Sequence, residues 1–170
     1  SIVECGVYEG GSLTLLAQLA KQEGKHRSVW GYDAFGSSSQ TAIEQLCNEP
    51  PIPMGPDILT VTQRLQSVGW NLDTDIHLVP GWFADTLVTL SPPAPIALLH
   101  IDADAYQSYK DVLNLLWPSL AVRGVAILDE YLSAKWFGAK RAVDEFMAEQ
   151  KDAKLHMDTR AYLTKEVLNG

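Results

Sequence analysis

Residues 95–104 read Pro-Ile-Ala-Leu-Leu-His-Ile-Asp-Ala-Asp, an apolar run that ends in two carboxylates. Residues 125–130 show the same arrangement as Val-Ala-Ile-Leu-Asp-Glu. A strand that is buried on both faces loses the alternation of polar and apolar side chains, so both runs are typical of central strands in a parallel sheet. The amphipathic stretch 106–120 between them predicts the helix that joins parallel neighbours, with a bend or an end near Pro118. Arg123-Gly124 predicts a turn just before the second run.

Short apolar runs alternate with longer amphipathic stretches along the rest of the chain. We predict further strands at residues 2–5, 28–32 and 76–79, and a closing hairpin made of residues 155–157 and 161–164. We predict further helices at residues 12–22, 41–47, 59–68, 82–90 and 137–151. Residues 35–39 read as a small-residue loop, and the proline-dense segment 49–56 cannot form regular structure. The pattern predicts one doubly wound α/β domain over residues 1–170.

The composition is that of a single globular domain, with 170 residues of which 46% are hydrophobic and 20% charged. The formal net charge of −8 disfavours nucleic acids and anionic membranes as partners, because their phosphates repel an acidic protein. No apolar run reaches the roughly 18 residues that a membrane-spanning helix needs. Cys5 and Cys47 lack disulfide or metal-site spacing, which indicates reduced thiols and a cytoplasmic protein. The chain opens at Ser1 without an initiator Met, and we expect flanking segments beyond it.

A glycine-rich turn follows the first predicted strand. Gly6, Gly10 and Gly11 let the backbone turn sharply and approach a ligand, and the next helix directs its free N–H groups at the same place. Asp33 follows the second strand, where a carboxylate can accept both hydroxyls of a ribose. Together these features indicate a nucleoside-binding edge, although the spacing is neither GxGxxG nor a phosphate-binding loop. A bare tight turn and a capping aspartate are the alternatives.

Four carboxylates follow the two central strands, namely Asp102, Asp104, Asp129 and Glu130. The carboxyl ends of neighbouring parallel strands lie at one edge of the sheet, so these groups repel one another unless a proton or a cation neutralises them. Mg²⁺ prefers such oxygen ligands. The sequence therefore predicts a magnesium site, and the alternative is that each acid caps the helix that follows it.

Five blocks resemble the macrocin-type (TylF-like) O-methyltransferases, which depend on a metal and on S-adenosylmethionine. They are ECGVYEGGS at 4–12, DAF at 33–35, PGWFADTL at 80–87, IDADAY at 101–106 and LDEY at 128–131. They occur in the family's order, and the block at 80–87 is the most specific because general α/β architecture does not require it. The resemblance implies a class I methyltransferase fold, that is, a Rossmann-like, mostly parallel seven-stranded sheet. It also implies O-methylation of a sugar or another diol-bearing natural product.

The resemblance assigns roles to individual positions. Residues implied for the cofactor, S-adenosylmethionine, are Glu4, Gly6, Gly10, Ser12, Asp33 and Asp102. Ligands implied for Mg²⁺ are Asp102, Asp129 and Glu130, and Asp104 is the implied general base. Independently of the resemblance, candidate contacts to the acceptor are Trp82, Tyr131, Lys135 and Trp136. The family usually has two aspartates where this chain has Asp129-Glu130, and glycine where it has Ala103, so the longer Glu130 is expected to shift or weaken the metal site.

The predicted chemistry is deprotonation of an acceptor hydroxyl followed by methyl transfer to its oxygen. A carboxylate removes the proton of a hydroxyl whose pKa a metal has lowered, and a vicinal diol suits the site because both oxygens can chelate one ion. Three alternatives stay open: a nucleoside-binding module without catalysis, a methyltransferase for catechol-like phenols, and a nicotinamide-dependent oxidoreductase, which the missing GxGxxG disfavours. His100 is expected to be a buried, hydrogen-bonded histidine. Related enzymes assemble, so a homo-oligomer is expected as well.

Overall fold

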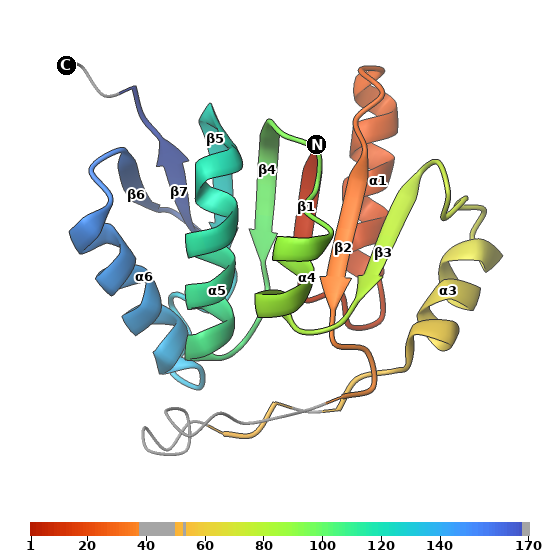
Figure 1. Cartoon of the computed structure of the whole chain (residues 1–170), viewed down its shortest axis with the longest axis horizontal. Coiled ribbons are helices and arrows are strands. Elements are labelled where there is room, and N and C mark those ends of the chain that lie inside the picture. Colours follow the sequence, from red (N-terminus) through yellow and green to blue (C-terminus); the bar gives the residue numbers. More distant parts are fainter. Residues whose placement is uncertain (38–49, 53, 168–170) are drawn as a thin grey trace.

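The computed structural model describes residues 1–37, 50–52 and 54–167. It contains one seven-stranded sheet in the order β3-β2-β1-β4-β5-β7-β6 (Figure 1). The strands are β1 (Ile2–Cys5), β2 (Val29–Asp33), β3 (Ile76–Pro80), β4 (Ile96–Ile101), β5 (Leu120–Leu128), β6 (Ala153–Met157) and β7 (Ala161–Lys165). Strands β1 to β5 run parallel, whereas β7 is antiparallel to both β5 and β6. The predicted doubly wound, mostly parallel sheet is confirmed.

Helices cover the two faces of this sheet. They are α1 (Gly11–Glu23), α3 (Ile58–Ser67), α4 (Phe83–Thr89), α5 (Tyr106–Leu116) and α6 (Phe137–Glu149). In Figure 1, α4, α5 and α6 lie in front of the sheet and α1 lies behind it. The helix predicted at 41–47, which carries Cys47, lies outside the described residues, as do parts of the predicted loop 35–39 and of the segment 49–56. Among the described residues, no helix has the length and apolar character needed to cross a bilayer.

Two apolar cores lie on opposite faces of the sheet. On the front face, α5 buries Tyr109, Val112 and Leu113 against the central strands. On the rear face, α1 and α3 pack on β1 to β3 through Leu13 and Val61. The front core also takes alternate residues of β5 and β7, and the residues between these therefore point to the rear. These rear-facing residues are only partly buried, and they are Val125, Ile127, Tyr162 and Thr164.

The connection between α5 and β5 differs from the prediction. The helix predicted over 106–120, with a bend or an end near Pro118, ends at Leu116, and a short 3₁₀ turn of Trp117–Ser119, which contains Pro118, follows it. Strand β5 then begins at Leu120, five residues before the apolar run that predicted it. Arg123 has a φ of 64°, and the register of β4 with β5 shifts between Ile96 and Leu98. The Arg123-Gly124 pair is thus an irregularity inside a strand rather than a turn before one.

The carboxyl ends of the central strands meet at the lower edge of the sheet in Figure 1. Cys5 is aligned with Tyr32 on one side and with Ile101 on the other, and Ile101 is aligned with Leu128. The residues that directly follow β4 and β5 continue this contact, because Asp102 N–H donates to the Cys5 carbonyl at 2.9 Å and Asp129 N–H donates to the Ile101 carbonyl at 3.0 Å. The fold therefore brings the glycine turn and the carboxylates to one edge.

Candidate active site

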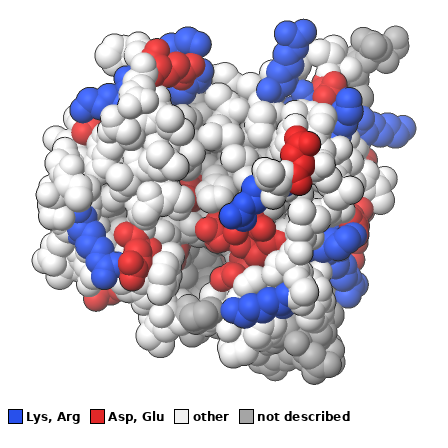
Figure 2. Space-filling model, turned by 180° about the vertical axis from the view of Figure 1, so that it is seen from behind, with Lys and Arg blue, Asp and Glu red and all other residues white. Residues whose placement is uncertain are grey.

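A cavity of about 290 Å³ opens at this edge of the sheet. Its wall comes from the segments that follow β1, β2, β3 and β4, and it includes Gly6, Asp33, Trp82, Asp102 and Asp104. Figure 2 shows acidic side chains gathered near the middle of the rear face. Three of the lining residues are carboxylates, with Asp33 at the end of β2 and both Asp102 and Asp104 after β4. The cavity therefore combines the two regions that the sequence marks as functional.

Gly6 brings the turn after β1 into contact with the segment after β4. Its φ is +97°, and a Cβ atom at this position would lie 1.7 Å from the Asp102 carbonyl oxygen. Only glycine permits both the backbone conformation and this close approach. Gly10 has a φ of +85° and packs on Leu65, and neither Gly10 nor Ser12 is among the residues that line the cavity.

Asp33 organises the same turn through its carboxylate. Its Oδ2 accepts the backbone N–H groups of Val7 at 2.7 Å and Tyr8 at 2.8 Å, and its Oδ1 accepts the N–H of Phe35 at 2.8 Å. A carboxylate has about four acceptor positions. Asp33 therefore fixes the loops that form the cavity wall, and it also faces the cavity with acceptor capacity to spare.

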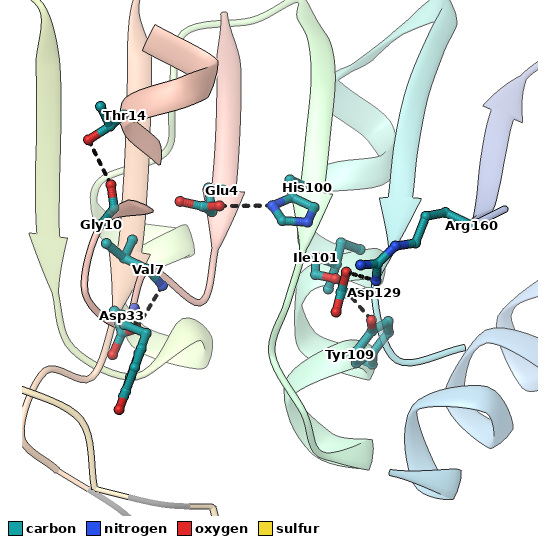
Figure 3. A network of polar contacts seen from close by, with 11 residues as sticks. Glu4, Val7, Gly10, Thr14, Asp33, His100, Ile101, Tyr109, Asp129 and Arg160 are labelled. Carbon is teal, nitrogen blue, oxygen red and sulfur yellow. Dashed lines mark hydrogen bonds and ion pairs between the residues drawn. The ribbon is translucent and has the colours of Figure 1, made fainter. Parts of the chain in front are cut away.

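Glu4 and His100 form a buried pair between β1 and β4 (Figure 3). Glu4 is fully buried, and its Oε1 lies 2.8 Å from His100 Nδ1. Burial opposes the charged form of His100, but the hydrogen bond and charge of Glu4, with the charges of Asp102 and Asp129, outweigh it and raise the pKa of His100. Among the described residues, Glu4 Oε2 has no hydrogen-bond partner. His100 is the buried, hydrogen-bonded histidine that we expected.

Asp102, Asp129 and Glu130 converge at the ends of β4 and β5. Each offers a carboxylate oxygen, and these oxygens lie within 4.8 Å of one another. Burial, followed by the hydrogen bond with Asp102, raises the pKa of Glu130. Asp129 also forms an ion pair with the Arg160 guanidinium, as Figure 3 shows. Three oxygen donors this close, one of them buried, fit a hard divalent cation.

Asp104 lies beside this group and lines the cavity. Burial, and next the charge of Asp102, raises the pKa of Asp104 to about 6. The residue before the first turn of α5 is Ala105, and none of the side chains described in the structure caps that helix end. The N-terminal flank of α6 is Trp136, and its end also has no cap from a described side chain. The alternative in which these acids cap the following helices is therefore wrong for α5 and α6.

Comparison with known proteins identifies the family. The family model for macrocin O-methyltransferase (TylF) matches residues 1–161. The chain belongs to this family. Demethyldecarbamoylnovobiocin O-methyltransferase of Streptomyces niveus is 30% identical over 154 residues, and mycinamicin III 3''-O-methyltransferase of Micromonospora griseorubida is 30% identical over 139 residues. The alignments cover 86% and 76% of this chain but only 58% and 54% of those relatives.

The fold agrees with this membership of the macrocin O-methyltransferase family. The solved structure of the O-methyltransferase NovP is 27% identical, with a TM-score of 0.80 over 98% of this chain and 72% of that one. A calicheamicin methyltransferase at 24% identity shares the fold, with a TM-score of 0.73 over 96% of this chain and 71% of that one. The strand order and these matches show the class I methyltransferase fold.

The residues proposed to contact the acceptor have different environments in this family member. Trp82 lines the cavity and is exposed. Tyr131 and Trp136 are buried, with the Tyr131 hydroxyl donating to Asp144 at 2.9 Å. The exposed Lys135 ammonium lies 4.3 Å from the centre of the Trp136 ring. None of these last three lines the cavity, so their acceptor contact stays a prediction for the chain as described.

Sequence reasoning missed two features of the site. Tyr109, which contacts Glu130 from the middle of α5, has no signal beyond its place on the apolar face of an amphipathic helix. The Glu4–His100 pair had a usable signal, because adjacent strands β1 and β4 place both residues on the same face of the sheet.

Proposed function

We propose that this chain provides the core of an O-methyltransferase that transfers a methyl group from S-adenosylmethionine to a hydroxyl of a sugar or another diol-bearing natural product, with the assistance of Mg²⁺. The observation that carries the proposal is the convergence of Asp102, Asp129 and Glu130 beside a cavity that Gly6 and Asp33 also line. Family membership supports the reaction class, and the two relatives quoted above are named as O-methyltransferases of demethyldecarbamoylnovobiocin and of mycinamicin III.

The nucleoside end of the proposed site lies at the turn after β1. Gly6 allows close approach to the backbone, and Asp33 both rigidifies the turn and presents an acceptor to the cavity. Glu4, Gly10 and Ser12 belong to the same segment, and we propose that they support the cofactor from positions outside the cavity wall. Preorganisation of this kind lowers the entropic cost of binding.

The acceptor end lies at the carboxylates. When bound, S-adenosylmethionine supplies the methyl group, and the cation, held by Asp102, Asp129 and Glu130, lowers the pKa of the acceptor hydroxyl. Asp104 takes the hydroxyl proton, and its raised pKa makes it a stronger base than an ordinary aspartate while it stays ionised near neutral pH. Trp82 supplies an apolar wall on which a sugar ring or aglycone can stack.

The experiment is methyl transfer to a panel of glycosides with vicinal hydroxyls and of catechols, read by mass spectrometry. Excess chelator is expected to abolish transfer and added Mg²⁺ to restore it. Titration calorimetry with S-adenosylhomocysteine is expected to show binding in both conditions, because Gly6 and Asp33, which we propose hold the nucleoside, are not cation ligands. Full activity in excess chelator would overturn the role of Mg²⁺. Binding of NAD in place of S-adenosylhomocysteine would overturn the reaction class.

A further inference from the structure

The hydroxyl group of Tyr109 lies between the two strand ends that carry the proposed cation ligands. Tyr109 is on α5 and is fully buried. Its hydroxyl oxygen lies 2.6 Å from Glu130 Oε2, 2.9 Å from the Ile101 carbonyl oxygen and 3.1 Å from the Glu130 backbone nitrogen. Figure 3 shows this side chain below Ile101 and Asp129. One side chain from a helix thus contacts both β4 and the residue after Asp129.

A phenolic hydroxyl has one proton to donate and two lone pairs to accept with, so its single proton is shared between two acceptors while a lone pair receives one donor. The Glu130 carboxylate and the Ile101 carbonyl are acceptors, and the Glu130 N–H is a donor. Ile101 directly precedes Asp102, and Glu130 directly follows Asp129. The hydroxyl therefore joins the two ligand-bearing segments, and water does not compete for it because the site is buried.

Glu130 needs such an anchor more than an aspartate does. Its side chain has one more rotatable bond, and ordering that bond costs conformational entropy. The contact at 2.6 Å orients the buried carboxylate from the core side, while Asp102 and Asp129 lie within 4.8 Å of it at the sheet edge. Groups that hold a metal ligand from behind commonly change metal affinity by 10- to 100-fold when they are removed.

We propose that Tyr109 is a positioning residue for the cation site, which aims Glu130 and holds the ends of β4 and β5 at a fixed separation. The inference rests on the proposed function, because it needs the carboxylates to bind a cation. It also assigns the longer Glu130 a partner that a shorter aspartate at position 130 could not contact in the same way.

The test measures Mn²⁺ binding by titration calorimetry in wild type, Tyr109→Phe, Glu130→Asp and the double variant. Tyr109→Phe is expected to lower Mn²⁺ affinity by about 10- to 100-fold. In the Glu130→Asp background the same substitution is expected to change affinity by less than about threefold, since the anchored group is gone. Tyr32→Phe is the matched control: it also removes a buried hydroxyl, one that donates to the Leu90 carbonyl at 2.6 Å, and is expected to leave Mn²⁺ affinity unchanged.

The possible results distinguish failure of the Tyr109 role from failure of the cation site itself. Circular dichroism and thermal unfolding confirm that each variant is folded, and if Tyr109→Phe unfolds, Tyr109→Met, which also lacks the hydroxyl, replaces it in the same comparison. If Tyr109→Phe binds Mn²⁺ as tightly as wild type, or if Tyr32→Phe loses as much Mn²⁺ affinity as Tyr109→Phe, the positioning role of Tyr109 is overturned. The cation site itself then still stands. An equal effect of Tyr109→Phe in both backgrounds overturns its coupling to Glu130. No Mn²⁺ binding by wild type overturns the cation site, and the inference with it.

Discussion

At the scale of single residues, the surroundings of Asp104 determine its chemistry. The carboxyl group is partly withdrawn from water and faces the charges of Asp102, Asp129 and Asp33, which Lys135 offsets only in part. Burial contributes most to the pKa of about 6. The same features that make Asp104 a better proton acceptor make its ionised form costly in the folded chain without a cation.

Replacing Asp104 by Asn is expected to cut turnover by roughly 10²–10⁴, the usual contribution of a general base, and to leave Mn²⁺ affinity nearly intact. A methyl-transfer assay measures the turnover, and titration calorimetry measures the Mn²⁺ affinity. Asp73→Asn, an exposed aspartate in the turn before β3, is the matched control. A loss of Mn²⁺ affinity that parallels the loss of turnover would make Asp104 a ligand instead of a base.

The same substitution is expected to stabilise the metal-free fold at alkaline pH. The pKa of Asp104 in the folded chain, about 6, lies above its ordinary value of 3.8, so stability is lost as the pH rises between these values. A shift of about two units corresponds to roughly 3 kcal/mol, and partial exposure reduces this to on the order of 1–2 kcal/mol. Urea denaturation in chelator is expected to show this gain for Asp104→Asn at pH 8. The gain is expected to vanish below pH 3.8, and equal stability at pH 8 would contradict the assignment.

The candidate residues were predictable from the sequence because they follow apolar strands whose carboxyl ends must meet at one edge. Tyr109 was not predictable, since its partner Glu130 is 21 residues away and helix patterning shows only that Tyr109 faces the core. Asp33 lines the cavity and also fixes the neighbouring loops, and only the first of these two roles was predicted. Its place at the cavity follows from its strand end, whereas its three backbone contacts depend on loop geometry.

At the scale of elements, the turn between β1 and α1 is specified by contacts rather than by glycine content. Gly6 touches the chain after β4, and Gly10 packs on α3 through Leu65. Gly11, which begins α1, has open space where a Cβ would lie. Gly6 and Gly10 are therefore constrained by close contacts and by a positive φ, whereas Gly11 is constrained by neither.

Gly6→Ala is expected to destabilise the fold by about 3 kcal/mol or more, from a left-handed φ and a clash with the Asp102 carbonyl. Gly11→Ala is expected to be neutral or to stabilise by up to about 1 kcal/mol, because alanine is the better helix former. Thermal unfolding compares the pair. Similar effects of the two substitutions would show that the Gly6 contact does not constrain the turn.

Asp33→Ala removes the acceptor of three backbone N–H groups and is expected to weaken S-adenosylhomocysteine binding by about 1.5–3 kcal/mol. Titration calorimetry measures the effect. Asp57→Ala is the control, since Asp57 caps α3 by accepting the Thr60 N–H at 2.8 Å and does not line the cavity. Asp57→Ala is expected to lower the stability of the fold without changing S-adenosylhomocysteine affinity. Unchanged S-adenosylhomocysteine affinity in Asp33→Ala would refute the assignment of Asp33 to the cofactor site.

Most elements were predicted within one or two residues because their apolar periods are strong. The first half of β5 was missed for a physical reason. Val122 and Arg123 are exposed, Arg123 has a positive φ, and Gly124 follows, which together are typical of a turn. Strand β5 pairs with β4 both before this irregularity, at Leu120, and after it, from Val125 onward. Pairing between strands far apart in the sequence cannot be predicted from the residues around Arg123 alone.

At the scale of the whole molecule, the two faces of the sheet are covered unequally. The front has a continuous core, whereas the rear-facing side chains of β5 and β7 are only partly buried in the chain as described. Val122 on β5 and Met157 on β6 add exposed apolar side chains at 55% and 64%. Exposed apolar side chains are candidates for an interface between chains.

We therefore expect the chain to form homo-oligomers, with a dimer as the simplest closed form. Light scattering across micromolar concentrations is expected to show a mass above the 18.7 kDa of one chain. Val122→Lys would be expected to shift the equilibrium toward monomer, and Lys25→Ala, at an exposed site after α1, serves as the control. Monomer alone at every concentration would count against the expectation.

The parallel pairing of β1 with β4 also has a consequence for how the chain acquires its site. Glu4 and His100 are 96 residues apart, and Gly6 meets Asp102 over a similar separation. Long-range parallel contacts form slowly, because a large loop must close before any of them contributes. Until β4 has been synthesised, the glycine turn lacks the strand that completes it. The proposed site is therefore expected to form only after β4 has joined β1, and refolding from denaturant is expected to restore ligand affinity together with the last phase of compaction.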